Sequence, residues 1–339
     1  MEKIVQNTDH DALTCKLSAI STRYIPCPLV HKDYFNYNDI YLSYYQTLKT
    51  LLSRRDQGSI NRALRNSYPV MNYGTYLRTV SIDSLLNSYL DERVSNEYIQ
   101  VVNLGCGSDL RFVHLLNNFK NIKYIDVDFK DALELKGKVL RTNLKFKQAL
   151  KLDTEIMDKT ENGSQLIHTE NYVMMEGDLK DTSDIITKLS RYTDTNAKTV
   201  FITECALCYL PDIAAQRLID KIIDTFDSGY WISYDPIGGN QEKDKDRFGK
   251  IMQDNLKSSR DLELPTLLKY FSEDLYSSRF TQHTNSSKKI TVNIKNLWEF
   301  YLQSINDNEK KRLQKLQFLD EIEELKIMQS HYIILNAQW

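Results

Sequence analysis

From residue 99 onward, short apolar runs alternate with segments of helical periodicity, and this alternation limits the folds that the chain can adopt. The runs have the length and composition of buried strands, and they lie at 98–104, 122–128, 172–176, 198–204 and 229–235. The helical segments fall between or after them, at 109–119, 130–150, 182–191 and 212–226. Strands separated by helices are joined by crossover connections, which make neighbouring strands parallel and cover both faces of the sheet with helices. The sequence therefore predicts an α/β fold built on a parallel sheet.

The two ends of the chain have a different pattern. Residues 1–95 show helical spacing of apolar residues, with prolines as breaks, and this predicts about four short helices. The segments expected after residue 240 are a charged loop at 241–249, a helix, a polar segment, a long helix near 306–328 and a final strand at 331–339.

Length and composition exclude several classes of protein. With 339 residues, of which 41% are apolar, the chain can bury a sizeable core. The 44 Lys and Arg residues and 46 Asp and Glu residues give a formal charge of −2, so no basic field favours nucleic acid or an anionic membrane. The N-terminus lacks the apolar stretch of a signal peptide, and no window contains the roughly 18 apolar residues of a membrane span. We therefore expect a cytoplasmic protein without nucleic-acid or membrane partners and, because no heptad seam is present, a monomer.

The five cysteines predict free thiols, because their number is odd and they lie in apolar or helical contexts. Cys205 and Cys208 form a C-x-x-C pair, but neither a second pair nor a nearby histidine accompanies it. We therefore expect no metal site.

A glycine-rich turn follows the first apolar run, in the sequence VVNLGCGSDLRF at 101–112. Glycine allows a strand to turn sharply into a helix while a ligand packs against the bare backbone. A dinucleotide and S-adenosylmethionine both suit such a turn. The dinucleotide fingerprint needs a third glycine where this chain has Leu110, and Asp109 would repel a pyrophosphate. S-adenosylmethionine carries no phosphate, and a turn without any ligand remains an alternative.

Acidic residues end the next three predicted strands, at the edge of the sheet where ligands bind. Asp128 is placed to accept hydrogen bonds from ribose hydroxyls, and Glu204 to hold a methionine ammonium. Asp178 can accept from an adenine amine while the backbone of Leu179 meets a ring nitrogen. Helix capping is the alternative role for Asp178, and for Asp128 or Asp131. Together the strand ends favour a cleft for an adenosyl ligand.

Several longer elements are similar to those of the leucine carboxyl methyltransferase family, which methylates the C-terminal leucine of the protein phosphatase 2A catalytic subunit. They lie at 6–21, 68–79, 101–112, 204–210, 231–239, 246–256 and 316–333. The elements NYGTYLR and DRFG, in this order, are the most specific. The resemblance implies a Rossmann-like S-adenosylmethionine-dependent methyltransferase fold in one compact domain. In it, residues 1–95 form a helical region that covers part of the active site, and residues 96–339 form the core with insertions, including a lid. The polar stretch 152–169 is expected to be a loop, and no role attaches to it.

The resemblance also implies roles for individual residues. Lys16 and Arg78 match positions of the family's cofactor site, and the remaining cofactor positions are matched by Gly105, Asp128, Asp178, Leu179 and Glu204. Tyr209 resembles a residue that faces the incoming leucine. Whether Arg78 holds the carboxylate of the cofactor or that of the substrate stays open, as does a surface ion pair for Arg78 and a surface position for Lys16. Gly238, Gly239 and Gly249 are consistent with a mobile lid.

The chemistry of such a site needs no catalytic acid or base. A C-terminal carboxyl group has a pKa of roughly 3.3–3.7, so the substrate is already an anion at neutral pH. The residues then have only to align the carboxylate oxygen, methyl carbon and sulfur for in-line displacement. Three alternatives remain open: a relative that modifies tRNA in the wybutosine pathway, a nicotinamide-dependent oxidoreductase, and a phosphatase-binding protein that uses no cofactor.

Overall fold

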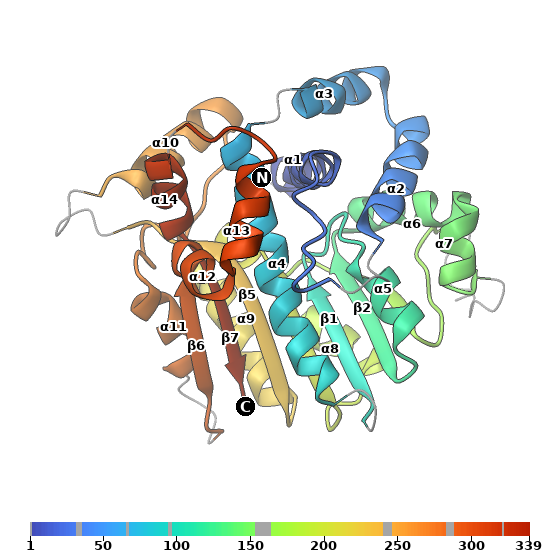
Figure 1. The fold of residues 1–339 in the computed structure, drawn as a ribbon. Helices are drawn as coiled ribbons and strands as arrows, with labels where there is room; N and C mark the ends of the chain where they lie inside the picture. The colour runs from blue at the N-terminus through green and yellow to red at the C-terminus, as the bar shows by residue number, and fades with distance from the viewer. Residues whose placement is uncertain are drawn as a thin grey trace.

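Seven strands form one mixed sheet at the centre of the part of the chain that the structure describes (Figure 1). The structure is a computed structural model, and it describes residues 2–31, 36–65, 68–93, 97–152, 164–239, 246–282, 288–320 and 322–339. The strands are β1 (Ile99–Leu104), β2 (Ile122–Asp128), β3 (Tyr172–Glu176), β4 (Lys198–Glu204), β5 (Gly229–Pro236), β6 (Thr291–Asn296) and β7 (Tyr332–Gln338). Their spatial order is β3-β2-β1-β4-β5-β7-β6. The pairs among β1 to β5 are parallel, so these five strands end at the same edge.

The parallel sheet expected from the five apolar runs is confirmed, and two further strands make the sheet mixed. β7 lies antiparallel between β5 and β6, because it enters the sheet from the edge at which β5 ends. β6 lies where a polar segment was expected, and its residues alternate between exposed and half-buried. It is one of the two edge strands, and because every second residue is exposed it lacks the apolar run that marks a strand covered on both faces.

Helices cover both faces of the sheet, as the alternation predicts. The helices that follow the parallel strands are α5 (Arg111–Asn118), α6 (Lys130–Thr142), α7 (Leu144–Ala149), α8 (Thr182–Tyr192) and α9 (Asp212–Thr225). α8 and α9 share an apolar core with one face of the sheet, whereas α5, α6 and α7 belong to the core on the other face. The segment expected as one helix at 130–150 is two, because the chain leaves helical geometry at Asn143, whose side chain then accepts a hydrogen bond from the N–H of Lys145 in α7.

The N-terminal region folds into four helices, in agreement with the expected number: α1 (Glu2–Ser21), α2 (Tyr37–Leu51), α3 (Arg54–Arg65) and α4 (Pro69–Asp91). Two of them are longer than expected, with 20 residues in α1 and 23 in α4. α4 runs along the face of the sheet, where Tyr89 stacks on Tyr230 of β5 with ring centroids 4.4 Å apart. α1 crosses above the edge at which the parallel strands end (Figure 1). The N-terminal region therefore packs directly on the sheet.

The C-terminal part adds α10 (Phe248–Arg260), α11 (Glu273–Thr281), α12 (Leu297–Ser304), α13 (Asp307–Gln314) and α14 (Ile322–Ser330). The prediction of one long helix at 306–328 is therefore wrong, because α13 ends at Gln314 and α14 begins at Ile322. The two short helices contact different parts of the fold: Arg312 of α13 donates to the carbonyls of Arg23 and Tyr24, whereas α14 packs on α4 and β7. Of two expected loops, 152–169 and 241–249, residues 153–163 and 241–245 lie outside the described residues. No helix among the described residues is long and apolar enough to cross a bilayer.

Candidate active site

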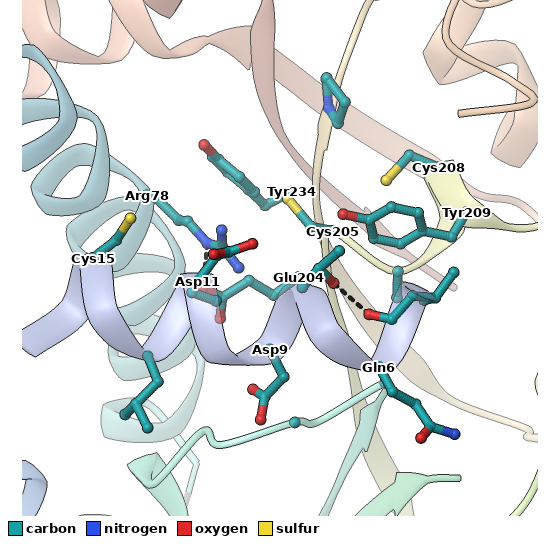
Figure 2. A pocket seen from close by; sticks show the side chains of 18 of the residues that line it. Gln6, Asp9, Asp11, Cys15, Arg78, Glu204, Cys205, Cys208, Tyr209 and Tyr234 are labelled. Carbon is teal, nitrogen blue, oxygen red and sulfur yellow. Dashed lines mark hydrogen bonds and ion pairs between the residues drawn. The ribbon is translucent and has the colours of Figure 1, made fainter. Parts of the chain in front are cut away.

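A cavity of about 630 Å³ lies at the edge where β1, β2, β4 and β5 end. This volume is within the range that binds small molecules and cofactors. α1 passes in front of the cavity, and Figure 2 shows polar side chains from several elements around it. The cavity lining includes all eight residues that the sequence proposed for the site: Lys16, Arg78, Gly105, Asp128, Asp178, Leu179, Glu204 and Tyr209.

The glycine-rich turn forms one side of the cavity. Gly105 and Gly107 have φ angles of +73° and +44°, a left-handed conformation that glycine adopts at little cost. A side chain at Gly105 would also meet Ala206, because an added Cβ would lie 3.0 Å from the Cβ of Ala206. The chain therefore turns at this point with its backbone facing the cavity.

Asp128, at the end of β2, closes the turn from the neighbouring strand. Its Oδ2 accepts a hydrogen bond from the N–H of Gly107 at 2.7 Å, and its Oδ1 accepts one from the N–H of Phe129 at 2.7 Å. The N-cap of α6 is Phe129 and no side chain caps this helix, so capping by Asp128 or Asp131 is wrong. Burial raises the pKa of Asp128 to about 6, against the effect of the two backbone hydrogen bonds.

Asp178 and Leu179 lie in the loop after β3 and face the same cavity. The Oδ1 of Asp178 accepts a hydrogen bond from the N–H of Lys180 at 2.9 Å, which holds the loop in a tight turn. The N-cap of α8 is Asp181, whose side chain accepts from the N–H of Asp184, so the capping alternative for Asp178 is also wrong.

Arg78 of α4 and Glu204 of β4 form an ion pair inside the cavity, where the Nε of Arg78 lies 2.6 Å from the Oε1 of Glu204. The Arg78 guanidinium also lies over the ring of Tyr234, 5.2 Å from its centroid. Burial opposes ionisation of Glu204, but the guanidiniums of Arg78 and Arg111 outweigh it and lower the pKa of Glu204 to about 2. Glu204 is therefore an anion at neutral pH, and Arg78 does not form a surface ion pair.

Lys16 is buried, so the alternative of a surface lysine is wrong. Its Nζ donates a hydrogen bond to the Oγ1 of Thr79 on α4 at 2.6 Å. Burial lowers the pKa of Lys16, and the negative charge of Glu204 opposes that shift. Lys16 thus lies among the charged groups that act on Glu204.

Tyr209 lies in the short helix η2 (Leu207–Tyr209), and its ring points toward Tyr234 in Figure 2. Next to it, Cys208 packs in a small apolar cluster with Leu264 and Leu267, and Met252 and Leu256 of α10 pack against this cluster. Tyr209 itself packs against the same cluster. One side of the cavity is therefore apolar, opposite the charged side chains of Arg78 and Glu204.

α10 lines one side of the cavity, whereas a mobile lid at Gly238, Gly239 and Gly249 stays a prediction. The N–H of Gly249 donates to the carbonyl of Gly238 at 3.0 Å, so α10 begins in direct backbone contact with the chain after β5. Arg260 at the end of α10 pairs with Asp11 of α1. α10 thereby contacts the helix that crosses the cavity.

Two residues that contribute to the site were not proposed from the sequence. Asp9 of α1 binds the glycine turn: its Oδ1 accepts from the N–H of Ser108 at 2.7 Å, and its Oδ2 from the Oγ of Ser108 at 2.5 Å. Arg111 of α5 contacts Glu204, with its Nη1 3.0 Å from Oε2. Helical spacing offers a weak signal for Asp9, because Asp9 and Lys16 are two helical turns apart and share one face of α1. Arg111 carries no such signal.

Comparisons with known proteins show which family the chain resembles. The model of a family described as leucine carboxyl methyltransferase matches residues 11–223. Leucine carboxyl methyltransferase 1 of Kluyveromyces lactis is 43% identical over 343 residues, which cover 100% of this chain and 99% of that protein. The protein of the same name from Eremothecium gossypii is 41% identical over 341 residues, covering 100% of each.

A solved structure from Thermobifida fusca, of a protein assigned to the methyltransferases, has a TM-score of 0.52 with 10% identity, and the match covers 87% of this chain and 93% of that one. At this identity the match shows the fold alone, and it confirms the expected Rossmann-like methyltransferase architecture. Together with the full-length matches to the yeast proteins, these findings show that the chain belongs to the leucine carboxyl methyltransferase family.

Proposed function

We propose that the protein transfers a methyl group from S-adenosylmethionine to the C-terminal leucine carboxylate of the protein phosphatase 2A catalytic subunit. The observation that carries this proposal is the Arg78–Glu204 pair inside the cavity. A guanidinium and a carboxylate side by side complement a ligand that presents a carboxylate and an ammonium together, as the methionine end of S-adenosylmethionine does.

The rest of the cavity fits the adenosine end of the same ligand. Asp128 faces the cavity beside the glycine turn, where its carboxylate can accept from ribose hydroxyls. Asp178 and Leu179 follow the neighbouring strand, where they can meet the adenine ring. Asp9 accepts the hydrogen bond of the Ser108 N–H, a group that would face the pyrophosphate in a dinucleotide site. A ligand without phosphate therefore suits this turn better than a dinucleotide.

The apolar side of the cavity supports a leucine as the acceptor. Met252, Leu256 and Leu264 line the cavity together with Cys208 and Tyr209, and a leucine side chain placed there would be removed from water. The terminal carboxylate then faces the cations, Arg78 and Lys16. Arg78 can bind either of two carboxylates, that of the methyl donor or that of the leucine.

In this proposal the residues bind and align, and none of them moves a proton. When bound, S-adenosylmethionine supplies a methyl group activated by a positive sulfur. Arg78 and Glu204 would hold the methionine end and Asp128 the ribose, so that the methyl donor would bind in a single orientation. The leucine carboxylate is ionised at neutral pH because its pKa is roughly 3.3–3.7. The walls formed by α1 and α10 exclude water, which strengthens the attraction between the carboxylate and the cations.

The test is incubation with tritium-labelled S-adenosylmethionine and phosphatase 2A, with and without the last leucine of the catalytic subunit. We expect label on the intact subunit alone, and its release in mild base, since a methyl ester hydrolyses there. Label on the shortened subunit, or on tRNA and not on the phosphatase, would contradict the proposal.

A further inference from the structure

Arg111 lies at the centre of a buried charge network behind the cavity. Its side chain is 3% exposed, and its Nη1 reaches both the Oε2 of Glu204, at 3.0 Å, and the Oδ2 of Asp109, at 2.5 Å. Its Nε donates to the Oδ1 of Asp83 on α4 at 3.0 Å. One guanidinium therefore bridges three carboxylates that come from β4, α4 and the glycine turn.

Asp83 is held in turn from the N-terminal region. Its Oδ2 lies 3.1 Å from the Nε2 of His31 and accepts a hydrogen bond from the hydroxyl of Tyr37. The Nδ1 of His31 accepts from the N–H of Cys27 at 2.8 Å, so Nε2 carries the proton that points at Asp83. The network thus runs without a break from Cys27 to Glu204.

Glu204 lines the cavity, whereas Arg111 and Asp83 do not. A ligand in the cavity therefore meets Glu204 and not the two residues behind it. Any effect of Arg111 or Asp83 on binding passes through the position and charge of the Glu204 carboxylate.

Two guanidiniums share the oxygens of Glu204: Arg78 binds Oε1, and Arg111 binds Oε2. An arginine and a carboxylate that meet without a third partner favour a bidentate pair, in which both oxygens face one guanidinium. Arg111 instead binds Oε2, so each guanidinium holds one oxygen of Glu204 and the carboxylate is fixed from two elements, α4 and α5.

We propose that Arg111 is a positioning residue for the carboxylate of Glu204 and that Asp83 fixes Arg111, so that this pair sets how tightly the protein binds the ammonium end of its methyl donor. The inference rests on the proposed function, because it assigns Glu204 to that ammonium. It adds two residues which touch no ligand and which the comparisons do not assign.

The test compares two ligands by calorimetry at pH 7.5. S-adenosylhomocysteine carries the ammonium and the carboxylate, whereas 5′-methylthioadenosine has the same adenosine and sulfur but neither charge. For Arg111→Gln we expect the Kd of S-adenosylhomocysteine to rise at least tenfold and that of 5′-methylthioadenosine to change less than twofold. Equal fold changes for the two ligands would show a general structural role, and no change for either would remove the role altogether; both outcomes overturn the inference.

The ratio of the two Kd values also reports the charge of Glu204. The charged groups around Glu204 are Arg78 of α4, Arg111 of α5 and Lys16 of α1. Asp109 shares the Nη1 of Arg111 with Glu204, and Asp83 binds the Nε of Arg111. Removal of Arg111 takes away one cation and raises the pKa of Glu204. We expect the preference for S-adenosylhomocysteine to be lost at a higher pH in Arg111→Gln than in the wild type as the pH is lowered. Asp128 contacts the ribose that both ligands share, so its titration cancels in the ratio.

Two further variants guard against misfolding of Arg111→Gln, which leaves Asp83 and Asp109 without their shared guanidinium. Asp83→Asn keeps the shape of the side chain and removes the charge at the far end of the network; we expect the same selective loss, about threefold. Arg111→Lys keeps the cation, and we expect it to restore the wild-type pH behaviour with intermediate affinity. A wild-type protein that binds neither ligand would overturn the proposed function itself, whereas wild-type binding with an unchanged ratio in all three variants would overturn only the role of Arg111.

Discussion

Arg78 and Glu204 are 126 residues apart in the sequence, and the Nε of one meets the Oε1 of the other at 2.6 Å inside the cavity. One residue comes from the N-terminal helical region and the other from the central sheet. The charged centre of the site therefore exists only when these two parts of the chain are packed together.

Removal of the guanidinium at Arg78 tests the site most directly. Arg78→Ala should weaken binding of S-adenosylhomocysteine by about 1.5–3 kcal/mol, or about 10- to 150-fold, because a charged hydrogen-bonding group is lost. Calorimetry measures the affinity, and circular dichroism checks that the variant is folded. Alanine at Arg191, an exposed arginine on α8, is the matched control and should bind like the wild type. A folded Arg78→Ala protein with wild-type affinity and turnover would remove Arg78 from the site.

Asp128 should make cofactor binding sensitive to pH. Its pKa is about 6 in the folded protein, against an ordinary value of 3.8, so it is ionised at pH 7.5 and becomes protonated as the pH falls through 6. The ionised form is the better acceptor for ribose hydroxyls. The Kd of S-adenosylhomocysteine should therefore rise between pH 7.5 and pH 5.5 in the wild type.

Asp128→Asn should bind more weakly at pH 7.5 and should lose this pH dependence, because the amide does not titrate. Asp307→Asn, at an aspartate whose side chain is 89% exposed, is the control and should keep the wild-type profile. An unchanged profile in Asp128→Asn would refute the assignment to the ribose.

Two aspartates on α1 should differ in their effect on stability. Asp9 makes two hydrogen bonds to Ser108, and Asp9→Ala should lower the free energy of unfolding by about 1.5–3 kcal/mol. Asp11 forms an ion pair with Arg260 in which both side chains are 50% exposed, so Asp11→Ala should cost less than about 1 kcal/mol. Urea denaturation followed by circular dichroism measures both. Equal decreases in the free energy of unfolding for the two variants would mean that the contact of Asp9 with the glycine turn stabilises the fold no more than a surface ion pair does.

Two glycines should respond to alanine with opposite signs. At Gly249 an added Cβ would lie 2.3 Å from the carbonyl oxygen of Gly238, so Gly249→Ala must push the start of α10 away from Gly238. We expect a loss of about 1–3 kcal/mol in stability and a higher KM for the phosphatase. At Gly58, in α3, an added Cβ meets nothing within 4 Å, and alanine should stabilise the helix by about 0.5–1 kcal/mol. Thermal unfolding and steady-state kinetics measure the two effects, and wild-type values for Gly249→Ala would show that α10 accommodates the methyl group without moving.

The elements that the sequence predicted well are those whose local pattern reflects burial on both sides. The strands β1 to β5 are short apolar runs, because helices cover both faces of this part of the sheet and the residues of these strands are almost all buried. β6 was missed because every second residue of its sequence, TVNIKN, is polar and exposed. The single helix expected at 306–328 failed for another reason: the apolar spacing continues through the turn, since Leu316 and Leu319 also pack against the core.

The sequence pattern predicted those residues of the site that lie at strand ends. Glycine and acidic residues at the ends of β1, β2 and β4 are visible as a pattern, because the topology brings strand ends to one edge. Arg78 and Lys16 came from the family resemblance, and Asp9 and Arg111 came from neither. The contacts of Asp9 and Arg111 join residues up to 99 positions apart, and a single sequence does not show which distant residues will meet.

The cavity is lined by the first helix and, at the other end of the chain, by Met328, Gln329 and Tyr332. During synthesis, the glycine turn and all five parallel strands are complete at Pro236. The C-terminal residues that line the cavity have not been made at that point. A complete cavity therefore needs nearly one hundred further residues, and trimming either terminus removes part of its lining; at the C-terminus the loss includes β7, which joins β6 to the sheet.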